Sequence, residues 1–105
     1  MSEFVCVGAA ADLAPGQCRE ASVGGRSVAL FNVGGEIRAL SNRCSHRGGP
    51  LGQGYLDGDT IICPWHGWGF DTRTGQSQMG PEHDVRRFAV RVENGQVFVA
   101  AEDRS

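Results

Sequence analysis

Residues 88–99 read FAVRVENGQVFV, and this stretch decides the fold class. Apolar residues occupy alternate positions before the Asn94-Gly95 pair and again after it. Alternation with a period of two places the apolar side chains on one face of a strand. An Asn-Gly pair between two such runs is a strong hairpin signal, because the two-residue turn needs positive φ at both positions. We therefore predict an antiparallel hairpin at the end of the chain.

The same signal occurs twice more, because Gly24-Gly25 and Gly34-Gly35 each separate two strand-like runs. Helical periodicity is hard to find, whereas short apolar runs bounded by turn residues recur. The remaining predicted strands are Phe4–Val7, a weak strand that ends near Val23, Ser27–Val33, Glu36–Leu40, Thr60–Cys63 and Trp68–Asp71. The sequence therefore predicts an all-β fold, with one small antiparallel domain over residues 1–105.

One segment departs from this pattern. Residues 41–59 contain Gly48-Gly49-Pro50 and Gly52-Gln53-Gly54, which are too broken for regular structure. A long loop inside a compact domain is usually functional or disordered. This one contains a Cys and a His, and we therefore predict a functional loop without regular structure.

Composition excludes several classes of function. The chain has 105 residues, and its ten Arg, no Lys and twelve acidic residues give a net charge of −2. No basic surplus exists to neutralise phosphates, which argues against nucleic-acid binding. Uninterrupted apolar runs such as Val28–Phe31 are far short of the ~20 residues that span a membrane. No secretory signal follows Met1, so we expect a cytoplasmic protein, in which four Cys are better metal ligands than disulfides.

Two clusters carry the chemistry: Cys44-Ser45-His46 and, after sixteen intervening residues, Cys63-Pro64-Trp65-His66. Each supplies one thiolate and one imidazole, ligands that suit iron–sulfur clusters, zinc or copper. A structural zinc site is one alternative, although zinc modules usually pair Cys with Cys and His with His. In a two-iron cluster, each loop could provide a Cys ligand to one iron and a His ligand to the other. Two His on one iron is the Rieske arrangement.

The two boxes, C44SHRGGPL and C63PWHGWGFD, resemble the cluster-binding boxes of Rieske [2Fe-2S] proteins. The resemblance is specific in the boxes and extends as a strand pattern over nearly the whole chain. It implies a small antiparallel Rieske-type β-sandwich, with the cluster held between two loops at one tip. It also implies one cluster per chain, with Cys44 and Cys63 on the buried iron and His46 and His66 on the outer iron. Gly80-Pro81 would belong to a third, proline-containing loop that shields the cluster.

The two boxes differ from those of high-potential Rieske proteins, and these differences limit the functions that the resemblance allows. The relatives in respiratory and photosynthetic complexes carry an extra Cys in each box, where this chain has Gly49 and Trp65. They also carry Ser and Tyr hydroxyls that donate hydrogen bonds to the cluster sulfurs, at the positions of Trp68 and Phe70 here. Because fewer such hydrogen bonds stabilise the reduced state less, we predict a potential toward the low end of roughly −150 to +300 mV.

The second box also resembles that of the large subunits of ring-hydroxylating oxygenases, which add a catalytic domain with a non-haem iron. Only 39 residues, including His83, follow His66, too few for such a domain. We therefore predict an electron-transfer component and not an enzyme. It would carry electrons from a flavoprotein reductase to a terminal oxygenase, without nucleic-acid or membrane partners. The alternatives are a small subunit of an assimilatory nitrite reductase and, more remotely, a structural zinc-binding interaction module.

The remaining candidates receive plainer interpretations. We expect His83 to be a surface loop residue, and Cys6 and Cys18 to be buried free thiols. Docking would centre on the cluster tip, where Trp65 and Trp68 flank His66. Loop packing and partner contact remain equally open for these two rings.

Overall fold

A computed structural model describes residues 4–42, 50–65 and 67–100 of the chain. Its ten strands are β1 (Phe4–Ala9), β2 (Cys18–Val23), β3 (Arg26–Val33), β4 (Glu36–Ser41), β5 (Tyr55–Asp57), β6 (Thr60–Ile62), β7 (Gly69–Asp71), β8 (Arg87–Phe88), β9 (Val90–Glu93) and β10 (Gln96–Ala100). Three short 3₁₀ turns, η1 (Ala10–Asp12), η2 (Leu51–Gln53) and η3 (Pro81–His83), complete the described elements. All strand pairs are antiparallel, which confirms the predicted all-β class.

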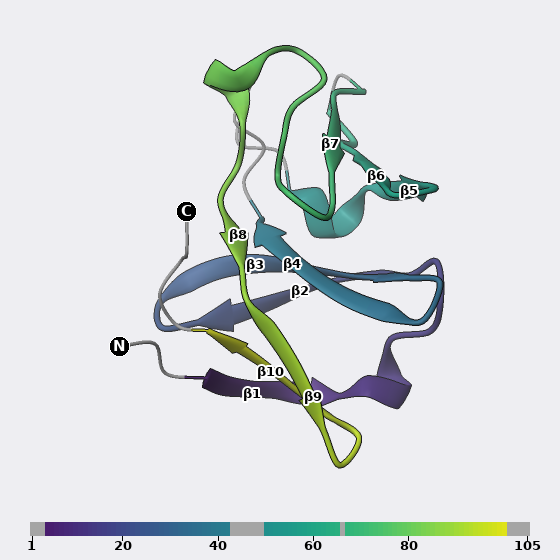
Figure 1. Cartoon of the computed structure of the whole chain (residues 1–105), viewed down its shortest axis with the longest axis vertical. Helices are drawn as coiled ribbons and strands as arrows, with labels where there is room; N and C mark the ends of the chain where they lie inside the picture. The colour runs from purple at the N-terminus through teal and green to yellow at the C-terminus, as the bar shows by residue number, and fades with distance from the viewer. Residues whose placement is uncertain (1–3, 43–49, 66, 101–105) are drawn as a thin grey trace.

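The strands form three sheets, with the orders β1-β10-β9, β2-β3-β4-β8 and β5-β6-β7. Figure 1 shows the β2-β3-β4-β8 sheet between the other two. We call the first two sheets the base and the β5-β6-β7 sheet the upper sheet. The chain passes between the two base sheets within one residue, since Phe88 pairs with β4 and Val90 pairs with β10.

The predicted hairpins are confirmed by the backbone. Both residues of the Gly24-Gly25, Gly34-Gly35 and Asn94-Gly95 turns have positive φ, between 52° and 101°. Only glycine adopts this region without strain, and asparagine tolerates it, which is why these pairs mark the turns so clearly. They join β2 to β3, β3 to β4 and β9 to β10.

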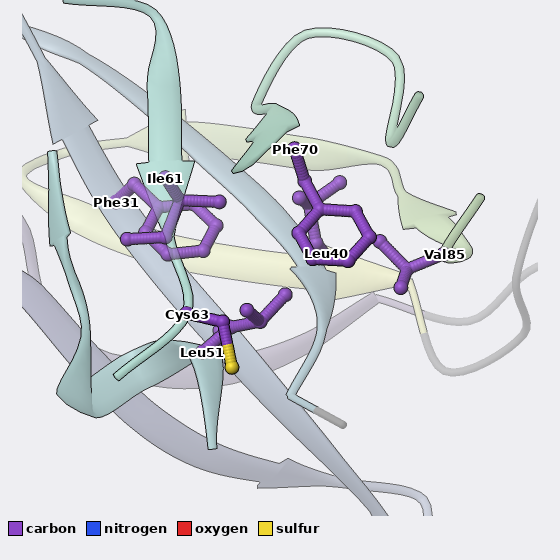
Figure 2. Packing of buried hydrophobic residues seen from close by; sticks show 8 residues of the cluster. Phe31, Leu40, Leu51, Ile61, Cys63, Phe70 and Val85 are labelled. Carbon is purple, nitrogen blue, oxygen red and sulfur yellow. The ribbon is translucent and has the colours of Figure 1, made fainter. Parts of the chain in front are cut away.

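Strand β3 of the middle sheet is buried on both faces over residues 28–32. Val28 and Leu30 of β3 pack toward the β1-β10-β9 sheet, with Val97 and Val99 in the same hydrophobic cluster. Their neighbours in β3 pack on the other face, in a second cluster that lies under the upper sheet. The second cluster comprises Ala29, Phe31, Leu40, Leu51, Ile61, Cys63, Phe70 and Val85, most of which are labelled in Figure 2. A strand covered on both sides needs a continuous apolar run, and this explains the sequence from Val28 to Phe31.

The prediction that residues 41–59 lack regular structure is wrong at its C-terminal end. Within the described part of this segment, η2 packs close to β2, and β5 forms a hairpin with β6. The turn is Gly58-Asp59, where Gly58 has a φ of +64°. A strand of three residues between glycine-rich turns is too short to show an alternating pattern in the sequence. Its strand conformation is stabilised by pairing with β6.

Candidate metal centre

Of the four predicted ligands, the structure describes Cys63. Cys44, His46 and His66 lie outside the described residues. Within residues 4–42, 50–65 and 67–100, no group of three or more His, Cys, Asp and Glu side chains is close enough to hold a metal ion. The four-residue ligand set therefore stays a prediction.

Cys63 begins a tight turn directly after β6. Its backbone N–H donates to the Trp68 carbonyl at 2.8 Å, and its own carbonyl accepts from the Gly67 N–H at 3.2 Å. The Cys63 residue is 2% exposed, within the hydrophobic cluster that includes Leu51 and Phe70. Figure 2 shows the Cys63 sulfur pointing away from the Phe70 ring. The turn therefore holds a thiol at the end of the hydrophobic core, in a fixed backbone geometry.

The chemistry at the Cys63 sulfur fits a ligand to a buried iron. The Trp65 N–H donates to Cys63 Sγ at 3.5 Å, which stabilises negative charge on the sulfur. The apolar residues around it limit access of water, and both features tune the potential of an iron–sulfur centre. One thiolate in this turn and one from the 44–46 box would make two thiolate ligands, and the two histidines of the boxes would complete the set. These side chains thus have the number and the softness that a [2Fe-2S] cluster needs.

A second segment lies against this turn. The Gln78 N–H donates to the Gly69 carbonyl at 2.9 Å, and the Trp68 and His83 rings meet edge to face at 4.9 Å. The His83 side chain is 35% exposed, so it lies at the surface as predicted, and its ring packs against Trp68. This contact places the segment with Gly80-Pro81 beside the second box. Its predicted role in shielding the cluster stays a prediction.

Arg38, which sequence reasoning did not single out, joins the base to the upper sheet. It projects from β4, with a side chain 13% exposed, and donates to Asp59 Oδ1 at 2.7 Å and to Thr72 Oγ1 at 2.9 Å. It also forms an ion pair with Glu36 at 3.1 Å. Burial alone would lower the pKa of Arg38, but hydrogen bonds and charges from Glu36 and Asp59 outweigh burial and raise it. The guanidinium therefore remains a cation that fixes one end of the upper sheet to β4, where the Thr72 hydroxyl donates to the Asp59 carbonyl at 2.7 Å.

Asn42, at the end of β4, is the second residue that sequence reasoning missed. It is 6% exposed, and hydrogen bonds connect it to Leu51 and Gly52, on the other side of the segment that carries Cys44 and His46. Its only signal in the sequence is its position two residues before Cys44.

The two remaining cysteines differ from the prediction and from each other. Cys6 in β1 is exposed, not buried as predicted, and its thiol donates to Gln96 Oε1 at 3.1 Å. Cys18 in β2 is half-buried, and burial raises the pKa of its thiol. Neither forms a disulfide. Because β1 has one face toward solvent, a strand position alone did not determine burial for Cys6.

Comparison with known proteins identifies the family of this chain. A family model for the Rieske [2Fe-2S] domain matches residues 3–101. Ferredoxin CarAc from Metapseudomonas resinovorans is 38% identical over 98 residues, which are 91% of this chain and 92% of that protein. The 3-phenylpropionate/cinnamic acid dioxygenase ferredoxin subunit of Escherichia coli (strain K12) is 42% identical over 74 residues, or 69% of this chain and 70% of that protein. Human apoptosis-inducing factor 3 is 40% identical over 91 residues, and this chain spans 15% of its length.

Solved structures similar to this chain also include ferredoxins of dioxygenase systems. The structure described as a complex of reduced oxygenase and oxidized ferredoxin in carbazole 1,9a-dioxygenase matches 97% of this chain and 96% of that chain. The TM-score is 0.88 and the identity 36%. The ferredoxin of carbazole 1,9a-dioxygenase from Nocardioides aromaticivorans IC177 also gives a TM-score of 0.88, with 31% identity over 94% of this chain and 98% of that chain. The fold, the cofactor class and the ferredoxin-like character predicted from the two boxes are thus confirmed, and the chain belongs to the Rieske [2Fe-2S] domain family.

Proposed function

We propose that this chain is a one-electron carrier that holds a Rieske [2Fe-2S] cluster on Cys44, Cys63, His46 and His66. Bound there, the cluster supplies one-electron transfer. The observation that carries the proposal is the Cys63 turn in the second box, where a buried sulfur accepts a hydrogen bond from the Trp65 backbone N–H. The protein holds this thiolate away from water, and in this proposal the two imidazoles bind the outer iron.

We further propose that electrons come from a flavin-dependent reductase and pass to a terminal oxygenase of the ring-hydroxylating type, in the cytoplasm. Two relatives above 30% identity are ferredoxins, and one of them is a dioxygenase subunit by name. One similar structure is a complex of such a ferredoxin with its oxygenase. No helix among the described residues is long and apolar enough to cross a membrane.

Two exposed apolar side chains mark the face on which a partner would dock. Trp65, beside His66, is 50% exposed, and Met79 in the adjacent segment is 53% exposed. Trp68, in contrast, is only partly exposed, and its ring packs on His83 and on the hydrophobic cluster. We therefore assign loop packing to Trp68 and partner contact to Trp65. An exposed flexible Met and an exposed aromatic ring suit a protein that binds two different partners in turn.

The nitrite reductase alternative has weaker support. A structure described as a putative NADH-dependent nitrite reductase small subunit from Mycobacterium tuberculosis has a TM-score of 0.88 but 22% identity. At that identity the likeness concerns the fold alone. The ferredoxins of dioxygenase systems are more similar in sequence, and the proposal therefore follows them.

Low-temperature EPR before and after dithionite tests the cluster assignment. We expect a silent oxidised protein and, after reduction, a rhombic signal with the low average g value of His-ligated clusters. Cys44→Ser is expected to abolish the signal and the visible colour, whereas the matched variant Cys18→Ser retains both. A colourless protein with one zinc would instead leave the structural zinc module.

Purified partners test the direction of electron flow. We expect a flavoprotein reductase with its nicotinamide cofactor to reduce the wild-type protein, and a terminal oxygenase to reoxidise it. Trp65→Ala should slow the second step, whereas Tyr55→Ala removes an equally exposed aromatic side chain from β5 and serves as the control. Equal rates for both variants would contradict docking through Trp65.

A further inference from the structure

Asn42 lies at the junction between the base and the segment that carries Cys44 and His46. Every polar group of this residue has a partner. Its backbone N–H donates to the Ser27 carbonyl at 3.0 Å, and its carbonyl accepts from the Leu51 N–H at 2.8 Å. Its Oδ1 accepts from the Gly52 N–H at 2.7 Å, and its Nδ2 donates to Glu20 Oε2 at 2.8 Å and Ser27 Oγ at 2.9 Å. A 6% exposed side chain with complete hydrogen bonding has one orientation.

These hydrogen bonds join the two ends of one chain segment. Asn42 precedes residues 43–49, and Leu51 and Gly52 follow them, so two hydrogen bonds join the residues that flank this segment. Gly52 adds a close approach of the backbone, because a side chain there would collide with the Glu20 side chain and the Arg19 backbone. Gln53 also reaches Glu20, with its Nε2 donating to Oε1 at 3.3 Å. Both ends of the segment are therefore attached to β2 as well as to each other.

The same junction reaches the second box. The Leu51 N–H donates to the Asn42 carbonyl, and the Leu51 side chain is fully buried in the hydrophobic cluster that contains Cys63 (Figure 2). A displacement of Leu51 would alter the packing around that cysteine, because close-packed interiors transmit strain.

We propose that Asn42 is a positioning residue for the cluster: its side chain sets the separation of the two ligand-bearing segments through Gly52, Glu20 and Leu51. The proposal rests on the ligand assignment above. Asn42 does not contact the cluster in this account, and it acts through the segment whose ends it joins.

The test substitutes one atom of the side chain. Asn42→Asp keeps the acceptor for the Gly52 N–H but loses the donor to Glu20 and places two carboxylates at the distance of a hydrogen bond. We expect the cluster absorbance to decay about tenfold faster under a fixed chelator concentration, which corresponds to about 1.4 kcal/mol. The EPR signal of the reduced protein is expected to broaden, because the ligand geometry becomes heterogeneous.

Asn32→Asp is the matched control. Asn32 is also 6% exposed, accepts from the Gly35 N–H at 2.8 Å and donates to the Leu13 carbonyl at 2.7 Å, on β3 in the base. The same substitution there breaks the same kind of buried hydrogen bond. We expect a lower Tm with an unchanged EPR line shape and a cluster decay rate within twofold of wild type.

A double variant separates positioning from general damage. Glu20→Gln with Asn42→Asp exchanges amide and carboxylate, which restores the donor–acceptor pair and the net charge of the wild type. We expect it to recover the wild-type decay rate and line shape. If Asn42→Asp purifies without a cluster, the test uses Glu20→Ala instead. This variant keeps Asn42 but removes Glu20 Oε2, the acceptor of the Asn42 Nδ2 hydrogen bond. We expect its cluster absorbance to decay severalfold faster than that of the wild type.

The inference is overturned if Asn42→Asp, or Glu20→Ala in its place, matches Asn32→Asp in decay rate and line shape, or if the exchanged pair restores neither. Failure of the proposed function would look different, because the wild-type protein would then lack the rhombic signal itself.

Discussion

At the scale of a single residue, a substitution of Phe70 tests the predicted low midpoint potential of the cluster. It is fully buried in β7 and has no hydroxyl to donate to a cluster sulfur. The Cys63 sulfur points away from its ring (Figure 2), and the high-potential relatives carry at this position a Tyr hydroxyl that donates to a cluster sulfur. We expect Phe70→Tyr to raise the midpoint potential, because a hydrogen bond to the thiolate stabilises the reduced state.

A redox titration of the purified variant measures this shift. Phe88→Tyr is the control, since it adds the same hydroxyl to the other hydrophobic cluster, at a residue 3% exposed. We expect an unchanged potential for it. An unchanged potential in a folded Phe70→Tyr would show that this ring faces only the hydrophobic core.

The two thiols outside the boxes are expected to react at different rates. Cys6 is exposed, whereas Cys18 is half-buried and its pKa is raised by burial. The thiolate is the reactive form, so a raised pKa moves the onset of alkylation of Cys18 to higher pH. At pH 7.5 we expect maleimide to modify Cys6 at least ~10-fold faster than Cys18. Mass spectrometry of timed samples measures both rates.

Cys6→Ser provides the control and is expected to retain cluster colour. Equal alkylation rates at the two positions in the native protein would contradict the burial that the structure gives them.

At the scale of elements, Arg38 connects β4 with the upper sheet. Arg38→Met removes the hydrogen bonds to Asp59 and Thr72 but keeps much of the side-chain volume. Because hydrogen bonds to charged groups contribute about 1.5–3 kcal/mol, we expect the free energy of unfolding to fall by about 2 kcal/mol. Urea unfolding followed by fluorescence measures the loss.

Arg73→Met is the matched comparison for Arg38. Arg73 pairs with Asp71 at 3.0 Å in the same turn region, but its side chain is 59% exposed. Exposed ion pairs contribute about 0–1 kcal/mol, so this variant should unfold almost as the wild type does. A larger loss for Arg73→Met than for Arg38→Met would refute the assignment of Arg38 as the connection.

Elements also differ in how well the sequence predicts them. The hairpins at Gly24-Gly25, Gly34-Gly35 and Asn94-Gly95 were predictable, because positive φ is a local requirement that few residues meet. Strand β5 was not, because three residues carry no period and its pairing with β6 comes from the assembled sheet. The exposure of Cys6 was missed for a related reason, since the face of β1 that meets solvent depends on where β1 packs.

At the scale of the whole molecule, removal of the cluster should affect the three sheets unequally. The hydrophobic cluster between the base sheets contains no predicted ligand, whereas the other cluster includes Cys63. The strands of the upper sheet have three residues each and depend on that second cluster. We expect hydrogen exchange of the metal-free protein to lose at least ~10-fold protection in β5–β7 and to retain protection in β3 and β10. Uniform loss over all three sheets would contradict independent stability of the base.

The sequence by itself determined the all-β class and the hairpins, and it predicts the chemistry of the ligand set. These are local properties: a turn needs particular φ angles, and a thiolate–imidazole set favours particular metals. Only the tertiary structure showed that β3 is buried on both faces, that Cys6 is exposed, and that Arg38 and Asn42 join segments 21 to 34 residues apart. Such contacts depend on how complete sheets stack, and no pattern within a short window of residues contains that information.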